Sequence, residues 1–185
     1  MATVMETLRR EHGSIARLLD ALEHQIGFFA RGGDPDYDVI RGVAEYFLDF
    51  PDRCHHPKED AVFQQLVATH PSAAAAIGDL PAEHRRGHER VVRFGETVNI
   101  LLGGADISRA DVVEAAKDFI DDERRHMRME DLYFFPIAEH LLTSAEWTQI
   151  EGDLTTGRDP LIGGKTEERF RKLREQLIAW EREAF

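Results

Sequence analysis

Apolar residues recur every three or four positions along most of this chain, which is the spacing of one face of an α-helix. The first such stretch covers about residues 3–31, and the turn sequence at 32–35 ends it. A second stretch covers about 37–69, where Pro51 and Pro57 must kink the helix or divide it into two pieces. Because the alternation typical of strands never runs for long, the pattern predicts an all-α protein.

Two more long helices are expected in the second half. After His70 and Pro71, a short Ala-rich turn leads to a helix over about 81–102, which Gly103 and Gly104 close. Ser108, with an acid three residues later, opens a fourth helix that runs to about residue 142, and Pro136 bends its last turns. Four long helices with short connections favour an antiparallel, up-and-down four-helix bundle.

The last part of the chain is expected to add helical segments to this bundle. Ser144 starts a shorter helical segment, and a loop rich in glycine precedes an amphipathic helix over about 166–183. No linker is long enough to separate a second domain. The sequence therefore predicts a single domain, with the bundle over 1–142 and a C-terminal helical extension over 143–185 packed on it.

Charge and cysteine content narrow the classes of partner. The chain has 23 Lys and Arg against 35 Asp and Glu, for a formal net charge of -12. Such a surface repels phosphate backbones and anionic lipids, so we expect neither nucleic acid nor membrane as a partner. Cys54 is the single cysteine, and the first ten residues lack the apolar run of a signal peptide. These features favour a cytoplasmic protein, and no protein partner is indicated.

An internal repeat carries the chemistry. The segment HHPKEDAVF at 55–63 matches HMRMEDLYF at 126–134, so each has His, three residues, Glu-Asp, two residues and Phe. In the first and third helices, the pair Glu11-His12 matches Glu83-His84. The chain therefore consists of two helix pairs, each with a histidine on its first helix and a His-x-x-x-Glu on its second.

The spacing within each segment places side chains together. Residues four apart on a helix lie on the same face, so His55 and Glu59 can reach one site, as can His126 and Glu130. His84 and His88 have the same spacing on the third helix, although the counterpart of His88 in the first half is an alanine. The side chains expected to point into the bundle are His12, His55, Glu59, His84, His88, His126 and Glu130.

This set is typical of a metal centre. Five imidazoles and two carboxylates are too many for one ordinary ion but suit two, and bundle cores can hold such pairs. Imidazole-rich sets suit iron, zinc, copper or nickel, whereas magnesium and calcium prefer oxygen alone. Two divalent cations would also compensate the charge of two buried carboxylates. A single histidine outside the pattern would more simply be a surface residue.

The order of these residues along the chain resembles the hemerythrin family. HHPKED and HMRMED resemble its bacterial branch, the HHE cation-binding proteins, and the resemblance covers about residues 3–142. It implies a non-haem centre of two Fe ions, bridged by two carboxylates and an oxo or hydroxo group. One iron would be bound by His84, His88 and His126 and the other, with a position open for dioxygen, by His12 and His55, while Glu59 and Glu130 would bridge them.

Two assignments within the set stay open. Oxygen-carrying hemerythrins place an aspartate five residues after the last ligand histidine, and Asp131 occupies that position here, whereas the internal repeat favours Glu130. His56 competes with His55, but it points about 100° away on the helix. Because Met127 stands at its counterpart, we expect His56 beside the site or at the surface.

The leading functional hypothesis is a di-iron protein that binds dioxygen or a related small diatomic or peroxide ligand. One alternative is an enzyme that handles peroxide or nitric oxide, with Tyr133 or Tyr46 as a donor. Another is an iron or oxygen sensor that acts through a protein partner, with the C-terminal segment as its output. The ligand set is shared by all three, so the sequence does not choose among them.

Overall fold

A computed structural model describes residues 3–154, 159, 161, 170–171, 173–175 and 177–178. Within these residues the structure is helical and has no strand, which confirms the all-α prediction. The elements are α1 (Val4–Ala30), α2 (Tyr37–Phe50), the π-helical turn η1 (Pro51–His55), α3 (His56–Thr69), α4 (Pro71–Ile77), α5 (Leu80–Leu102), α6 (Arg109–Met129), the π-helical turn η2 (Glu130–Phe134), α7 (Phe135–Leu141) and α8 (Ser144–Asp153).

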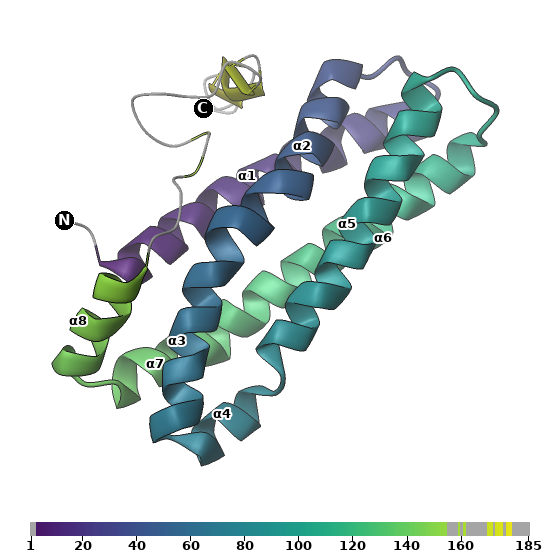
Figure 1. Ribbon diagram of the computed structural model, residues 1–185. Coiled ribbons are helices and arrows are strands. Elements are labelled where there is room, and N and C mark those ends of the chain that lie inside the picture. The colour runs from purple at the N-terminus through teal and green to yellow at the C-terminus, as the bar shows by residue number, and fades with distance from the viewer. Residues whose placement is uncertain are drawn as a thin grey trace.

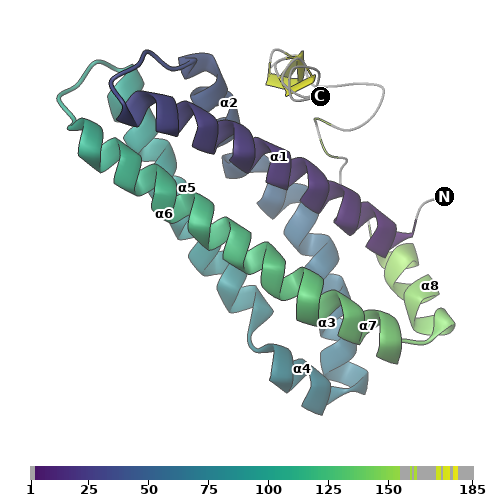
Figure 2. The same ribbon diagram turned by 180° about the vertical axis from the view of Figure 1, so that it is seen from behind.

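These elements form four long rods that lie side by side (Figure 1). The rods are α1, then α2–η1–α3, then α5, then α6–η2–α7. α1 packs on both α2 and α6, and α5 also packs on both α2 and α6, so the four rods close into a ring. The same arrangement is seen from behind in Figure 2. The chain is therefore an up-and-down helical bundle, as its pattern predicts.

Side-chain caps start the rods where the sequence expects them. Thr3 and Glu6 form a reciprocal capping box at α1, and the Asp36 carboxylate accepts hydrogen bonds from the first turn of α2. Ser108 Oγ accepts a hydrogen bond from the Asp111 N–H at the start of α6. After α1, Gly32 adopts a φ of 87°, a conformation that glycine allows without strain.

The second and fourth rods are each interrupted by a π-helical turn rather than by a break. η1 begins at Pro51, and Pro57 then stands within the first turn of α3. η2 likewise precedes Pro136, which lies in the first turn of α7. Single π-helical turns inside α-helices are frequent at functional sites. Here the first ends at His55 and the second begins at Glu130.

One predicted turn is a helix. The Ala-rich segment after His70 forms α4, with Pro71 in its first turn. A run of alanines has the highest helix propensity, and proline is well tolerated at a helix start. The pattern gave no apolar stripe long enough to predict it.

The apolar core is divided into two clusters along the bundle. One contains Phe47, Phe94 and Phe119, and the Phe94 and Phe119 rings stack with centroids 4.7 Å apart. The other contains Leu8 and Phe134. Each long rod contributes residues to both clusters, and the predicted ligands lie between them in sequence. A polar layer thus lies between two regions of apolar packing.

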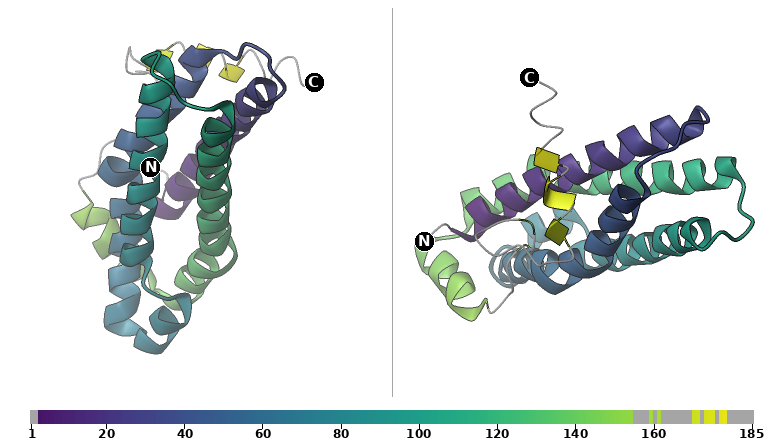
Figure 3. Two further views of the ribbon diagram at one scale, coloured as in Figure 1. Left: turned by 90° about the vertical axis from the view of Figure 1, so that its right-hand side faces the viewer. Right: turned by 90° about the horizontal axis from the view of Figure 1, so that it is seen from above.

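The described part of the C-terminal extension contacts the bundle. Phe170 and Leu173 are buried in the first apolar cluster, and the Phe170 ring meets the Tyr46 ring edge-on. These two residues belong to the amphipathic helix expected over 166–183, and most of that expected helix lies outside the described residues. Two further views show α8 at the end of the bundle where α1 begins (Figure 3), and the Val4 N–H donates to Glu151 Oε1. Among the described helices, none combines the length and the apolar composition that crossing a bilayer requires.

Candidate metal centre

Six of the seven predicted ligands meet in the polar layer. They come from all four rods and are His12, His55, Glu59, His84, His126 and Glu130. Both carboxylates are fully buried, with 0% of their surface exposed. Two buried anionic groups in one apolar enclosure need compensating charge, so the layer is a candidate cation site.

The Glu59 carboxylate faces two groups of imidazoles at once. Its Oε1 lies 3.4 Å from His12 Nε2 and 3.2 Å from His55 Nε2. Its other oxygen, Oε2, lies 3.4 Å from His84 Nε2. One oxygen therefore points to the α1–η1 side of the layer and the other to the α5 side.

Glu130 repeats this arrangement from the opposite rod. Its Oε2 lies 3.4 Å from His12 Nε2, and its Oε1 lies 3.1 Å from His126 Nε2 and 3.5 Å from His84 Nε2. Each carboxylate thus offers one oxygen to the His12 side and one to the His84–His126 side. Two carboxylates in this arrangement could bridge two cations.

The atoms that face the centre of the layer lack hydrogen bonds. Among the described residues, the buried side-chain nitrogen and oxygen atoms without a hydrogen-bond partner are His12 Nε2, His84 Nε2, His126 Nε2 and both carboxylate oxygens of Glu59 and Glu130. A buried polar atom left unsatisfied costs about 1–3 kcal/mol. Because every one of these atoms is a potential metal ligand, the donor set fits a pair of ions between Glu59 and Glu130.

The outward nitrogens of the imidazoles are held by carboxylates. His12 Nδ1 lies 3.1 Å from Asp131 Oδ1, and His84 Nδ1 lies 3.0 Å from Asp60 Oδ1. The two aspartates occupy matching positions in the internal repeat. A carboxylate at Nδ1 fixes the ring and leaves Nε2 free for a metal. In each Glu-Asp pair of the repeat, the glutamate faces the centre and the aspartate holds a histidine from outside. The sequence predicted a role in both halves for the glutamate only.

The structure brings Glu130, not Asp131, to the centre. The Asp131 side chain is 44% exposed and contacts the outward nitrogen of His12. Glu130 is the residue one helical turn after His126, so both reach the same side, as the repeat indicates.

His55 has a different support. Its Nδ1 lies 2.9 Å from Glu11 Oε2, and the Lys58 ammonium donates to both oxygens of Glu11, at 2.9 and 3.2 Å. This lysine also donates to the backbone carbonyl of Cys54. Burying Glu11 would be costly without this cation, so Lys58 makes the support of His55 possible. Cys54 itself is buried in the apolar core, as expected of a small apolar side chain.

The prediction that His88 joins the cluster is corrected. Its side chain is 48% exposed, and its Nδ1 forms an ion pair with Asp52 at the surface. In the structure His88 therefore lies outside the layer, together with Asp52 at the surface.

His56, which was expected beside the site or at the surface, lies closer to the layer than His88 does. It lies with Glu59, His84 and His126 in a group whose potential ligand atoms are within 4.8 Å of one another. Its Nδ1 lies 3.0 Å from Asp52 Oδ1. The sequence signal that could have found it is the doubled histidine at the end of η1, where a π-helical turn changes the facing of the next residue.

Protonation of the histidines compensates the carboxylates when metal is absent. Burial would lower the pKa of His55, but the charge of Glu59 and the Glu11 hydrogen bond outweigh it and raise that pKa to about 9. Burial is likewise outweighed at His84, where the Asp60 hydrogen bond and the nearby carboxylates of Glu130 and Glu59 raise the pKa to about 11. Burial would raise the pKa of Glu59, yet the surrounding imidazoles hold it well below its usual value.

Replacing Asp131 with alanine should weaken metal binding without abolishing it. The change removes the group that orients His12, and losing such a partner typically lowers metal affinity about 10- to 100-fold. A competition titration with a chromophoric chelator measures this. Replacement of Glu130 by alanine should cost far more. Equal losses for the two variants would contradict the assignment of Glu130 as the bridge.

Comparison with known proteins identifies the family. The family model described as the hemerythrin HHE cation binding domain matches residues 3–138, which is most of the chain and contains all six residues of the cluster. No curated protein and no solved structure matches the chain. With the helical bundle and its buried layer of histidine and glutamate, this match shows that the chain belongs to the hemerythrin HHE cation-binding family.

Proposed function

We propose that this protein binds two iron ions in the polar layer and, through them, dioxygen or a related small ligand. The observation that carries the proposal is the pair of carboxylates, each with one unpartnered oxygen toward either side of the layer. The family match supports the binding of cations in this layer. The same ligands would also accept zinc, but the resemblance to hemerythrins favours iron.

The residues of the chain would hold and shield the ions. When bound, two ferrous ions supply the electrons and the coordination position that dioxygen binding requires. The Phe135 ring stacks on His12 with centroids 5.0 Å apart, and the Phe50 ring lies 6.2 Å from His55. Such apolar walls keep water and protons away from the centre. The Nδ1 protons of His12 and His84 stay on the outer side, at the Asp131 and Asp60 carboxylates.

Of the two tyrosines considered as donors for an enzyme, one is exposed and the other has a different hydrogen-bond partner. The Tyr133 side chain is 61% exposed. The buried Tyr46 hydroxyl donates to Asp159 Oδ2 at 3.3 Å, on the side of the C-terminal extension. Ligand binding therefore has more structural support here than a reaction that needs a tyrosine donor.

Anaerobic loading with ferrous iron tests the proposal. We expect two irons per chain by metal analysis and a change of the visible spectrum when dioxygen is admitted, reversed when it is removed. Zinc as the only metal retained, with no spectral response to dioxygen, would argue decisively against the proposed function.

Metal loading should also release protons. Because His55 and His84 have raised pKa values, of about 9 and 11, both carry a proton at pH 7 in the metal-free protein. Two divalent ions at the same nitrogens must displace them, so at least about two protons per chain should appear at pH 7. The release should shrink as the pH rises through 9 toward 11, where the metal-free histidines are already neutral. A pH-indicator titration in weak buffer measures it, and loading without proton release would contradict binding by these imidazoles.

A further inference from the structure

We propose that the buried Lys58 makes the two metal positions unequal. Lys58 is a positioning residue that acts through Glu11, which holds the ring of His55 in place. The ion on the His12 side is therefore bound more tightly, and released more slowly, than the ion on the His84 side. This inference rests on the proposed two-ion centre, and it leaves the position for dioxygen on the ion where the resemblance places it.

The support of His55 is a buried ion pair. Both Lys58 and Glu11 are buried, and the Lys58 ammonium donates to the two Glu11 oxygens at 2.9 and 3.2 Å. Glu11 Oε2 in turn lies 2.9 Å from His55 Nδ1. The Phe50 ring covers the ammonium, with 6.0 Å between Nζ and the ring centre. Because solvent screens a buried pair only weakly, Lys58 holds Glu11 firmly at the outward nitrogen of His55.

The carboxylates behind two other imidazoles reach the surface. Asp131, which holds His12, is 44% exposed, and Asp60, which holds His84, is 32% exposed. Water screens these two interactions, so each is weaker than the same contact made in the interior. Of these three described imidazoles, His55 is the one with a buried carboxylate behind it. Since such a carboxylate fixes an imidazole and raises its basicity, His55 is expected to be the strongest ligand of the three.

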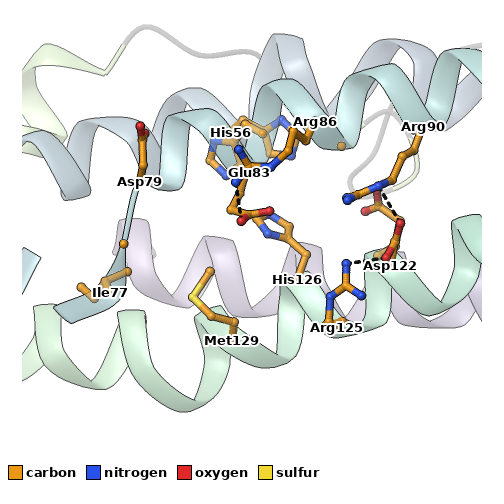
Figure 4. A pocket seen from close by; sticks show the side chains of 14 residues that line it. His56, Ile77, Asp79, Glu83, Arg86, Arg90, Asp122, Arg125, His126 and Met129 are labelled. Carbon is orange, nitrogen blue, oxygen red and sulfur yellow. Dashed lines mark hydrogen bonds and ion pairs between the residues drawn. The ribbon is translucent and has the colours of Figure 1, made fainter. Parts of the chain in front are cut away.

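The second half of the internal repeat lacks the buried ion pair. Met129 stands at the counterpart of Lys58, and Glu83 stands at the counterpart of Glu11. Glu83 is exposed and forms an ion pair with Arg86. Figure 4 shows Glu83 and Arg86 on α5 and Met129 on α6. Methionine offers no charge to compensate a buried carboxylate, so Glu83 stays where Arg86 and water compensate it.

His126, the counterpart of His55, is held less firmly. Among the described residues, its ion pair is with Glu130 through the metal-facing Nε2, and no carboxylate holds its outward nitrogen. Its side chain is 17% exposed, against 3% for His55. The ring also borders a cavity of about 320 Å³ between α5 and α6 (Figure 4). Because its Nε2 is buried, this cavity gives the ring room to turn without exposing the ion directly.

Loading with one equivalent of ferrous iron tests the inequality in the unchanged protein. Crystals grown anaerobically with one iron per chain should show one strong anomalous peak, on the His12 side. From the fully loaded protein, a ferrous chelator should remove one iron at least about tenfold faster than the other. A peak on the His84 side, equal peaks on both sides, or release of both irons at one rate would overturn the inference.

Replacing Lys58 with methionine, the residue at its counterpart, should remove most of the inequality. The change leaves Glu11 without its cation, so His55 loses its support, and the affinity for the tighter ion should fall by about 10- to 100-fold. The affinity for the weaker ion should change less. A chelator competition titration gives both dissociation constants. A variant that is only less stable to heat, with an unchanged ratio of the two constants, would show that Lys58 does not position His55.

Arg86→Met is the matched control, because it removes the cation from the counterpart glutamate at the surface. It should leave both dissociation constants unchanged, and an effect as large as that of Lys58→Met would overturn the inference. If Lys58→Met does not fold with an unpaired Glu11, the double variant Glu11→Met/Lys58→Met decides, because it buries no unpaired charge. The double variant must show the same selective loss of the tighter ion.

The wild-type protein separates the failure of this inference from the failure of the proposed function. A protein that does not retain two irons defeats the proposed function before any variant is compared. Two irons retained with equal affinity leave that function intact and defeat only the inequality of the two positions.

Discussion

Replacing Glu59 with glutamine is expected to abolish the binding of both metal ions. Glutamine keeps the shape of the side chain but removes its charge, and it cannot offer an anionic oxygen to each side of the layer. Glu59 faces His12 and His55 with one oxygen and His84 with the other, so one substitution affects both ions. Since losing a partner of a ligand already costs about 10- to 100-fold in affinity, we expect losing the bridge to cost well over about 100-fold.

Metal content after dialysis and a chelator competition measure this effect, with helicity followed by circular dichroism. Glu45→Gln is the matched control, because Glu45 lies on the exposed face of α2. It should bind two ions as the wild type does. A Glu59→Gln protein that retains one ion at full affinity would show that the two sites do not share this carboxylate.

Removing the metal should destabilise the folded protein strongly. Without ions, the inward nitrogens of His12, His84 and His126 and all four carboxylate oxygens of the layer lack hydrogen bonds. An ion present at 1,000 times its dissociation constant stabilises the native state by about 4.1 kcal/mol. For a chain of this size, that corresponds to a rise in Tm of about 8–16 °C on metal loading.

Thermal unfolding of the loaded and metal-free protein at one pH tests the size of this effect. Glu59→Gln should unfold at nearly the same temperature with and without metal, because it has lost the site. An equally large metal-dependent rise in that variant would place the stabilising ions elsewhere on the protein.

Much of the fold follows from local signals in the sequence. The ends of α1 could be predicted because Thr3 and Gly32 supply specific capping interactions. The four-rod arrangement follows because long amphipathic helices joined by short loops have few other ways to bury their apolar faces. The π-helical turns were predicted only as kinks at Pro51 and Pro136, because the choice between a break and a wider turn depends on the packing of neighbouring rods.

The metal centre was predictable to the extent that it follows the internal repeat. The repeat relates His55 and Glu59 to His126 and Glu130, and all four meet in the structure. The error at His88 arose because that residue has no counterpart in the first half, so helical spacing alone supported it. Spacing fixes the face of a helix to within about 40°, which is too coarse to decide between the layer and the surface.

The supporting carboxylates needed the tertiary structure. Asp60 and Asp131 each contact a histidine of another rod, His84 and His12 respectively. The repeat marks both aspartates as a pair. Which histidine each one holds depends on how α3 packs beside α5 and how η2 packs beside α1, and no local pattern contains that information.

The location and number of the ions can be measured directly by anomalous diffraction at the iron edge from crystals of the iron-loaded protein. We predict two peaks per chain, separated by about 3.5–4 Å, between the carboxylates of Glu59 and Glu130. One peak should lie beside His12 and His55, and the other beside His84 and His126. A single peak in the layer, or iron bound only at surface residues, would contradict a shared two-ion centre.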